Sequence, residues 1–233
     1  MLLQVLEFLY PALLATVVLS AIHSWLGIQL LERGAVFPAL ALVQLAALGT
    51  AVATRFGFSP YIGAFVLSIS GAFLFTWNRR DTLVAMIYAV SAAATLLFLG
   101  GDPLTGDLLS VRVRTIALIA VVYIAVAAAL YFLRRESLLF FAVAIVLTSS
   151  VRIAGVLLAF TYLVAPPIVS RRFAIAWPVS ALLSAAGIFL AFKFDQPTAL
   201  TVVCTFGVAL VVVLSAQSLV RRRKPPKHYA TKL

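Results

Sequence analysis

Few side chains in this sequence could do chemistry, and the most informative ones interrupt long apolar stretches. They are His23, Gln44, Arg152 and Tyr162. An imidazole can bind a metal ion or carry a proton, and a guanidinium can bind an anion or a carboxylate. The amide of Gln44 and the phenol of Tyr162 can donate and accept hydrogen bonds. Because polar groups are costly in apolar surroundings, each is a candidate functional residue.

His23 is the candidate metal ligand. A metal site needs three or four ligands, and no second histidine or carboxylate stands in a comparable apolar stretch. The alternative is therefore a single imidazole hydrogen-bonded to a neighbouring helix. The sequence shows no catalytic triad, no haem-type histidine pair and no chain of carboxylates, so we do not expect an enzyme. The single cysteine, Cys204, allows no internal disulfide and no cysteine-based metal cluster.

Composition defines the class of protein. Apolar residues make up 64% of the 233 residues and charged residues 11%, against about 45–50% and about 25% in soluble domains. The mean hydropathy is +1.14. So little polar surface excludes a soluble enzyme, a disordered or fibrous protein and a disulfide scaffold. Long unbroken apolar runs also argue against an outer-membrane barrel, whose strands alternate. We predict an all-α, polytopic helical membrane protein.

The apolar runs predict about nine membrane-crossing segments. One run, Leu138–Val169, would be about 48 Å long as a single helix, whereas the hydrocarbon core is about 30 Å thick. We therefore predict a break at Thr148–Arg152, where hydroxyl groups could satisfy a bent backbone. Whether Leu138–Ser149 crosses completely stays open. The other expected spans are Val5–Leu31, Ala35–Thr54, Tyr61–Trp77, Thr82–Leu99, Thr115–Leu133, Pro178–Phe192 and Thr198–Leu219.

The positive charge is distributed as the positive-inside rule requires. With the N-terminus outside and nine crossings, thirteen of the 18 Lys and Arg residues fall on the inner side. The net charge of +11 therefore indicates loop anchors rather than nucleic-acid binding. We expect residues 1–219 to form one transmembrane domain and residues 220–233 a basic, disordered cytoplasmic tail. The first residues lack the basic start of a signal peptide, so we expect none to be removed.

Several segments resemble one family of membrane proteins. The stretch Leu147–Pro166, which reads Leu-Thr-Ser-Ser-Val-Arg-Ile-Ala-Gly-Val-Leu-Leu and continues Ala-Phe-Thr-Tyr-Leu-Val-Ala-Pro, closely resembles the permease subunits of metal (zinc, manganese or iron-chelate) ABC transporters. Ile22–Ile28, Gln44–Gly49 and Ile87–Val90 look like the same family, as does Pro197-Thr198 followed by Val202–Gly207.

The resemblance implies a fold and a set of partners. It implies a type II ABC-importer permease-like fold in the bacterial cytoplasmic (inner) membrane, surrounded by lipid, with an outer N-terminus and a cytoplasmic C-terminus. It also implies a second copy of the chain or other membrane subunits as partners, ABC ATPases inside and an outer protein that delivers metal. Gln44, Arg152 and Tyr162 would then be polar groups along the substrate path, with His23 as metal ligand.

Two departures from the family pattern leave two functions open. Ala39 stands where the family carries an aspartate before its Leu-Ala-Leu run. The inner connector Arg134–Ser137 has four residues, about one helical turn, so no coupling helix for an ATPase fits there. The chain is either a permease-like subunit that translocates a divalent metal or metal chelate, or a permease-derived structural subunit of a larger complex. The short connector predicts that the chain alone does not stably hold an ABC ATPase.

Overall fold

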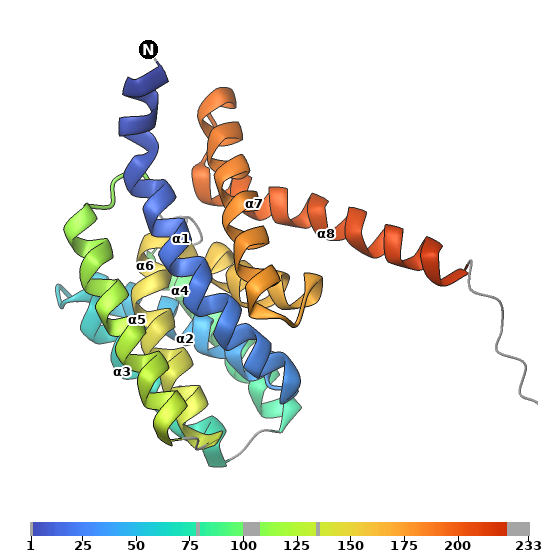
Figure 1. The fold of residues 1–233 in the computed structure, drawn as a ribbon. Coiled ribbons are helices and arrows are strands. Elements are labelled where there is room, and N and C mark those ends of the chain that lie inside the picture. Colours follow the sequence, from blue (N-terminus) through green and yellow to red (C-terminus); the bar gives the residue numbers. More distant parts are fainter. Residues whose placement is uncertain (1, 78–79, 100–107, 134–135, 223–233) are drawn as a thin grey trace, which may run out of the picture.

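The computed structural model describes residues 2–77, 80–99, 108–133 and 136–222. These residues form helices and contain no strand, which confirms the prediction of an all-helical membrane protein (Figure 1). The helices are α1 (Leu2–Glu32), α2 (Val36–Arg55), α3 (Pro60–Trp77), α4 (Asp81–Leu99), α5 (Val113–Leu133), α6 (Glu136–Val169), α7 (Phe173–Phe194) and α8 (Thr198–Arg222).

Six of these helices are long and apolar enough to cross a membrane: α1, α2, α3, α5, α6 and α7. In α4 and α8 the apolar segments of the described residues are shorter, Leu83–Phe98 and Thr198–Val213. Helix α8 continues three residues past the predicted boundary at 219/220, to Arg222. The rest of the predicted tail, residues 223–233, lies outside the described residues.

The predicted break in the sixth stretch is real, but its predicted position was wrong. The helix runs on through Thr148–Arg152, and the backbone leaves helical geometry at Gly155, with φ 80° and ψ 167°. Only glycine adopts this conformation without strain. The hydroxyls of Thr148 and Ser149 donate to carbonyls of their own helix, at 2.8 and 2.9 Å, and so need no break. After Gly155 the chain turns toward α7 and α8 (Figure 1).

Small residues allow the central helices to approach closely. Gly49 of α2 faces Gly63 of α3, and a Cβ added to either glycine would collide with the backbone of the other. Gly27 of α1 lies in the same way against the Leu163 carbonyl of α6. Helix packing in membranes depends on such close approaches, because no hydrophobic effect drives helices together in lipid. Helices α1, α2 and α6 thereby form the centre of the bundle.

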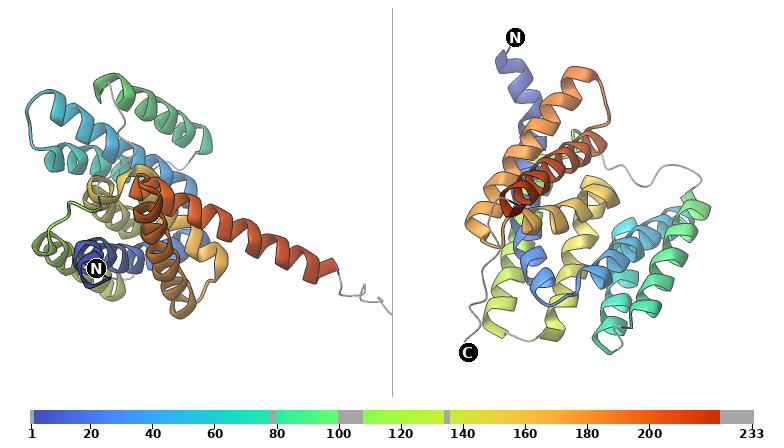
Figure 2. Two further views of the ribbon diagram at one scale, coloured as in Figure 1. Left: turned by 90° about the horizontal axis from the view of Figure 1, so that it is seen from above. Right: turned by 90° about the vertical axis from the view of Figure 1, so that its right-hand side faces the viewer.

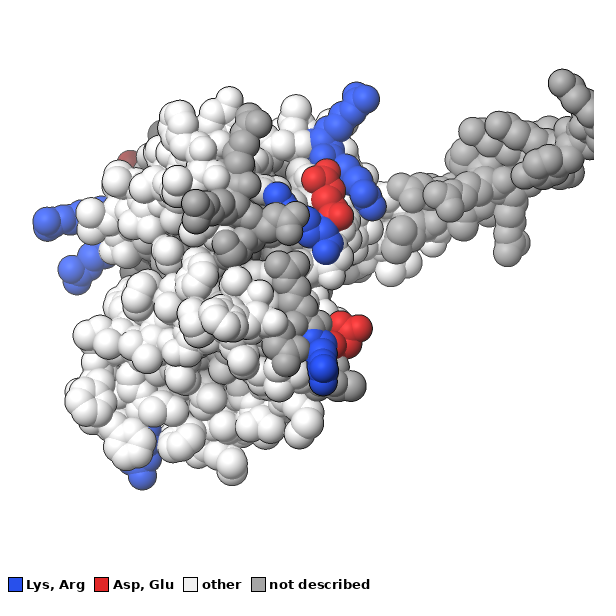
Figure 3. Space-filling model, turned by 90° about the horizontal axis from the view of Figure 1, so that it is seen from below, with Lys and Arg blue, Asp and Glu red and all other residues white. Residues whose placement is uncertain are grey.

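The last helix leaves the bundle. The first part of α8 is packed through Ala199, Val202 and Phe206, which are almost fully buried. Beyond them Val208 and Val211 are exposed, and α8 projects away from the other helices (Figures 1 and 2). From below, the visible charged side chains lie in small groups, some with acidic and basic side chains next to each other, on a largely uncharged surface (Figure 3).

Candidate functional site

Three consecutive hydroxyl residues of α6 each contact a different helix. We call Thr148, Ser149 and Ser150 the hydroxyl triplet. Thr148 Oγ1 lies 2.9 Å from Ser68 Oγ of α3, and Ser149 Oγ lies 3.1 Å from the Tyr123 hydroxyl of α5. Ser150 Oγ lies 3.0 Å from His23 Nε2 of α1. Successive residues of an α-helix point about 100° apart, so three in a row can reach three neighbours. The hydroxyl triplet therefore joins α6 to α3, α5 and α1.

The hydrogen bonds of His23 define its tautomer. Its ring is fully buried, and Nδ1 lies 2.7 Å from the Leu19 carbonyl oxygen. Because a carbonyl only accepts, Nδ1 carries a proton and donates it. In the neutral imidazole Nε2 then accepts, so the Ser150 hydroxyl donates to it. Two carbonyl oxygens of α6 also lie within reach of the Ser150 hydroxyl: Val146 O at 2.9 Å, which already accepts from Ser149, and Leu147 O at 3.4 Å.

Both ring nitrogens of His23 thus have partners within the protein. The rings of Tyr123 and Tyr162 lie around it, with centroids 6.2 and 6.3 Å away. Within the described parts of the chain, no group of three or more His, Cys, Asp or Glu residues could hold a metal ion. A metal bound at Nε2 would have to replace the Ser150 hydroxyl.

Tyr162 lies beside His23, and its hydroxyl is poorly satisfied. The side chain is fully buried and its ring packs edge-on against Phe206, with centroids 5.7 Å apart. Among the described residues its hydroxyl has no hydrogen-bond partner, and neither do the buried hydroxyls of Ser24 and Ser180. Buried polar groups are normally hydrogen-bonded. The hydroxyls of these helices can therefore form further hydrogen bonds, for example with a substrate.

Gln44 and Arg152 do not join this cluster. Gln44 is buried on α2, five residues after Ala39, and no hydrogen bond within the described residues joins it to His23 or Tyr162. Arg152 is exposed, and its guanidinium lies over the Tyr61 ring, 4.5 Å from the centroid. Arg152 shares a polar pocket with Arg112 at the start of α5. Of the four residues singled out in the sequence, the structure therefore brings together only His23 and Tyr162.

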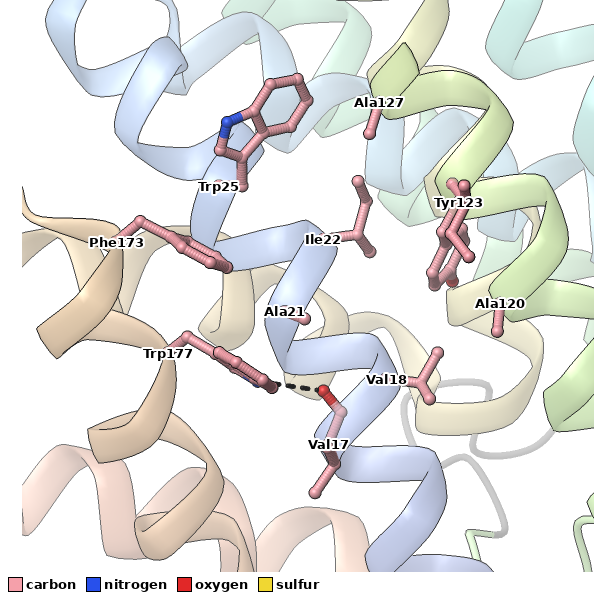
Figure 4. Close-up of a pocket in the computed structure, with 11 residues that line it drawn as sticks. Val17, Val18, Ala21, Ile22, Trp25, Ala120, Tyr123, Ala127, Phe173 and Trp177 are labelled. Carbon is pink, nitrogen blue, oxygen red and sulfur yellow. Dashed lines mark hydrogen bonds between the residues drawn. The ribbon is translucent and has the colours of Figure 1, made fainter.

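An apolar groove adjoins the His23 cluster, because Tyr123 lines the groove and also lies beside His23. It has a volume of about 410 Å³ and is formed by α1, α5 and α7, with Ile22, Trp25 and Tyr123 on its walls (Figure 4). Trp177 donates to the Val17 carbonyl across 3.2 Å and stacks on Phe173. Since its lining is almost entirely apolar, the groove cannot bind a bare ion and suits a hydrocarbon chain.

Sequence analysis missed Ser68, Tyr123, Ser24 and Ser180. Serine is common in apolar helices as a small packing residue, and nothing in the spacing of these four indicates a role. Only the run Thr148-Ser149-Ser150 stood out, and it was interpreted as a helix break rather than as a junction between helices.

The described residues thus form a bundle of helices, six of them long and apolar enough to cross a membrane, with a break in α6 at Gly155. Residues 5–141, more than half of the chain, match the ABC 3 transport family, and the chain belongs to that family. This confirms the resemblance found in the sequence.

The fold is similar to that of a solved structure described as PsaBC from Streptococcus pneumoniae in complex with Fab. The TM-score is 0.75 at 16% sequence identity, over 91% of this chain and 94% of that chain. No curated protein matches the sequence. The chain is therefore a permease-like integral membrane subunit, and its family is one of transporters rather than of enzymes.

Proposed function

We propose that the chain is the transmembrane permease subunit of an ABC transporter that moves a divalent metal or a metal chelate across the bacterial cytoplasmic membrane. The observation that carries this proposal is the match to the ABC 3 transport family. The likeness to PsaBC over nearly the whole of both chains supports it.

In this proposal the substrate passes the buried polar cluster of α1 and α6. His23 is the candidate metal ligand, and Tyr162, with its unused hydroxyl, lies beside it. Gln44 would be a further polar group along the path, and Arg152 a functional polar group at a separate point, away from the His23 cluster. A metal ion that binds His23 at Nε2 would displace the hydroxyl of Ser150. The hydrogen bond between α1 and the hydroxyl triplet would then be lost.

We further propose nine crossings, with the N-terminus outside and the C-terminus inside, as one transmembrane domain followed by a short basic tail. Arg112, at the start of α5, and Arg152 line one pocket. The first half of α6 therefore returns to the level at which α5 begins, which supports a complete crossing before Gly155. The basic residues then fall mainly inside.

Reporter fusions test this topology. Fusions after Thr54 and Leu99 are expected to report an outer location, and a fusion after Leu219 an inner one. Activity of a phosphatase reporter, which needs the outer compartment, and of a cytoplasmic fluorescent reporter would be compared at each site. An outer location after Leu219 would contradict nine crossings.

The proposed partners are an ABC ATPase, lipid, and a second copy of the chain or other membrane subunits. PsaBC aligns with this chain over 94% of its length, so no large segment of that fold is missing here. The likeness therefore favours a transporter that still works with an ATPase, in spite of its short inner connector.

A specific observation favours a second candidate, a non-transporting structural subunit. Helix α5 ends at Leu133 and α6 begins at Glu136, so no coupling helix fits between them. In addition, the family aspartate is replaced by the buried Ala39. Reconstitution with an ATPase from the same source separates the two candidates, because only a transporter subunit should make ATP hydrolysis depend on the substrate.

A further inference from the structure

A polar pocket of about 420 Å³ lies where three helices meet, apart from the His23 cluster. Its lining is mainly polar, in contrast to the apolar groove between α1, α5 and α7. Tyr61 comes from the start of α3, Arg112 and Thr115 from the start of α5, and Arg152 from the end of the first half of α6. The remaining lining residues are Ser110, Val111 and Ile153.

The pocket carries two positive charges that no acidic side chain of the described residues neutralises. Neither Arg112 nor Arg152 forms an ion pair or a side-chain hydrogen bond with the described residues. Arg152 is held by stacking on the Tyr61 ring, with 4.5 Å between its Cζ and the ring centroid. Stacking orients a guanidinium but leaves the N–H groups at its edge able to donate. Two guanidinium groups, that of Arg152 oriented by this stacking, are therefore available to an anion.

The start of α5 adds to this positive potential. Arg112 precedes the helix, and its carbonyl accepts from the backbone N–H groups of Thr115 and Ile116, at 2.9 and 3.2 Å. The N-terminal end of a helix carries a partial positive charge. The hydroxyl of Thr115, also in the lining, can donate to an anion. The pocket can thus bind an oxyanion such as a phosphate group between its two arginines. A guanidinium binds phosphate through two parallel N–H donors.

The surroundings favour a phosphate that carries acyl chains. Ile62, next to Tyr61, is 64% exposed and Val113, next to Arg112, is 44% exposed. Phe65, one turn further along α3, is also exposed. In a membrane-spanning chain such residues face hydrocarbon, directly beside the two arginines. We propose that this pocket binds the phosphate of an anionic phospholipid, with its acyl chains along α3 and α5.

Lipid retention by the purified full-length chain tests the proposal. The chain would be equilibrated in detergent with equal amounts of phosphatidylglycerol and phosphatidylcholine, and native mass spectrometry would count the adducts. We expect preferential retention of phosphatidylglycerol. Arg152→Gln or Arg112→Gln should weaken it about tenfold, which corresponds to the loss of one strong charged contact.

Arg114→Gln is the matched control. Arg114 lies on the same helix end and is exposed but does not line the pocket, so this variant should retain phosphatidylglycerol as the wild type does. Arg152→Lys keeps the positive charge but lacks the planar guanidinium with its paired donors, so it should retain less phosphatidylglycerol than the wild type and more than Arg152→Gln. Equal retention of both lipids, or equal losses in all four variants, would overturn the proposal. Displacement of phosphatidylglycerol by millimolar inorganic phosphate would also overturn it, in favour of a site for free phosphate.

Discussion

Replacement of Gly27 by leucine is expected to prevent the chain from folding. A Cβ at position 27 would fall on the carbonyl oxygen of Leu163 and would also come within 2.9 Å of Pro167 Cγ. The obstacle is backbone, so rotamer changes cannot relieve it, and α1 would have to move away from α6. Such overpacking costs about 1–3 kcal/mol where side chains can adjust, and we expect more here. That movement would also separate His23 from Ser150.

Gly207→Leu provides the matched control, because a Cβ at Gly207 of α8 meets no atom within 4 Å. Both variants would be expressed as fluorescent fusions and followed by detergent size-exclusion chromatography. Gly27→Leu should give aggregate or no protein, whereas Gly207→Leu should elute as the wild type does. A monodisperse Gly27→Leu protein with unchanged thermal stability would show that α1 and α6 do not pack as described.

Replacement of His23 by alanine is expected to lower the stability of the protein without changing its metal content. The variant loses the hydrogen bonds to Leu19 and Ser150 and leaves a cavity between Tyr123 and Tyr162. Large-to-small changes in a packed core cost about 2–5 kcal/mol. Because one imidazole does not make a stable metal site, a transported ion would pass His23 without being retained, so we expect a loss of stability rather than a loss of bound metal.

Thermal unfolding in detergent and elemental analysis after equilibration with zinc or manganese would measure both effects. His228→Ala, which changes the only other histidine of the chain, controls for non-specific loss of metal-binding groups. Stoichiometric metal in the wild type that disappears in His23→Ala, with little change in unfolding temperature, would establish His23 as a ligand instead.

Composition and apolar run lengths were sufficient to predict the class of fold. They could not place the break in α6, because a serine or threonine hydroxyl can bond to its own helix as well as to a bent backbone. The hydroxyls of Thr148 and Ser149 bond to their own helix. Gly155 marks the break only through its backbone dihedral angles, which a single glycine in an apolar run does not reveal.

The candidate site was only partly predictable for a related reason. His23 and Tyr162 stand out as polar residues in apolar helices, and the structure places their rings side by side. That Ser150 is the partner of His23 depends on the rotation of α6 about its axis. The pairing of Arg112 with Arg152 depends on the relative lengths of α5 and the first half of α6. Neither quantity can be read from one sequence.

The most direct test of the central claim is ATP hydrolysis in liposomes that contain the chain and a candidate ABC ATPase from the same source. If the chain is a transporter permease, vanadate-sensitive hydrolysis should rise severalfold when zinc, manganese or a ferric chelate is supplied with the matching binding protein. Liposomes with the ATPase alone serve as the negative control, and liposomes with the Gly207→Leu chain should behave as those with the wild type. Two results together would contradict the transporter function and identify a structural subunit. The rate of ATP hydrolysis would be the same with and without the chain and the metal, and the chain would be recovered only inside a larger assembly that lacks an ATPase.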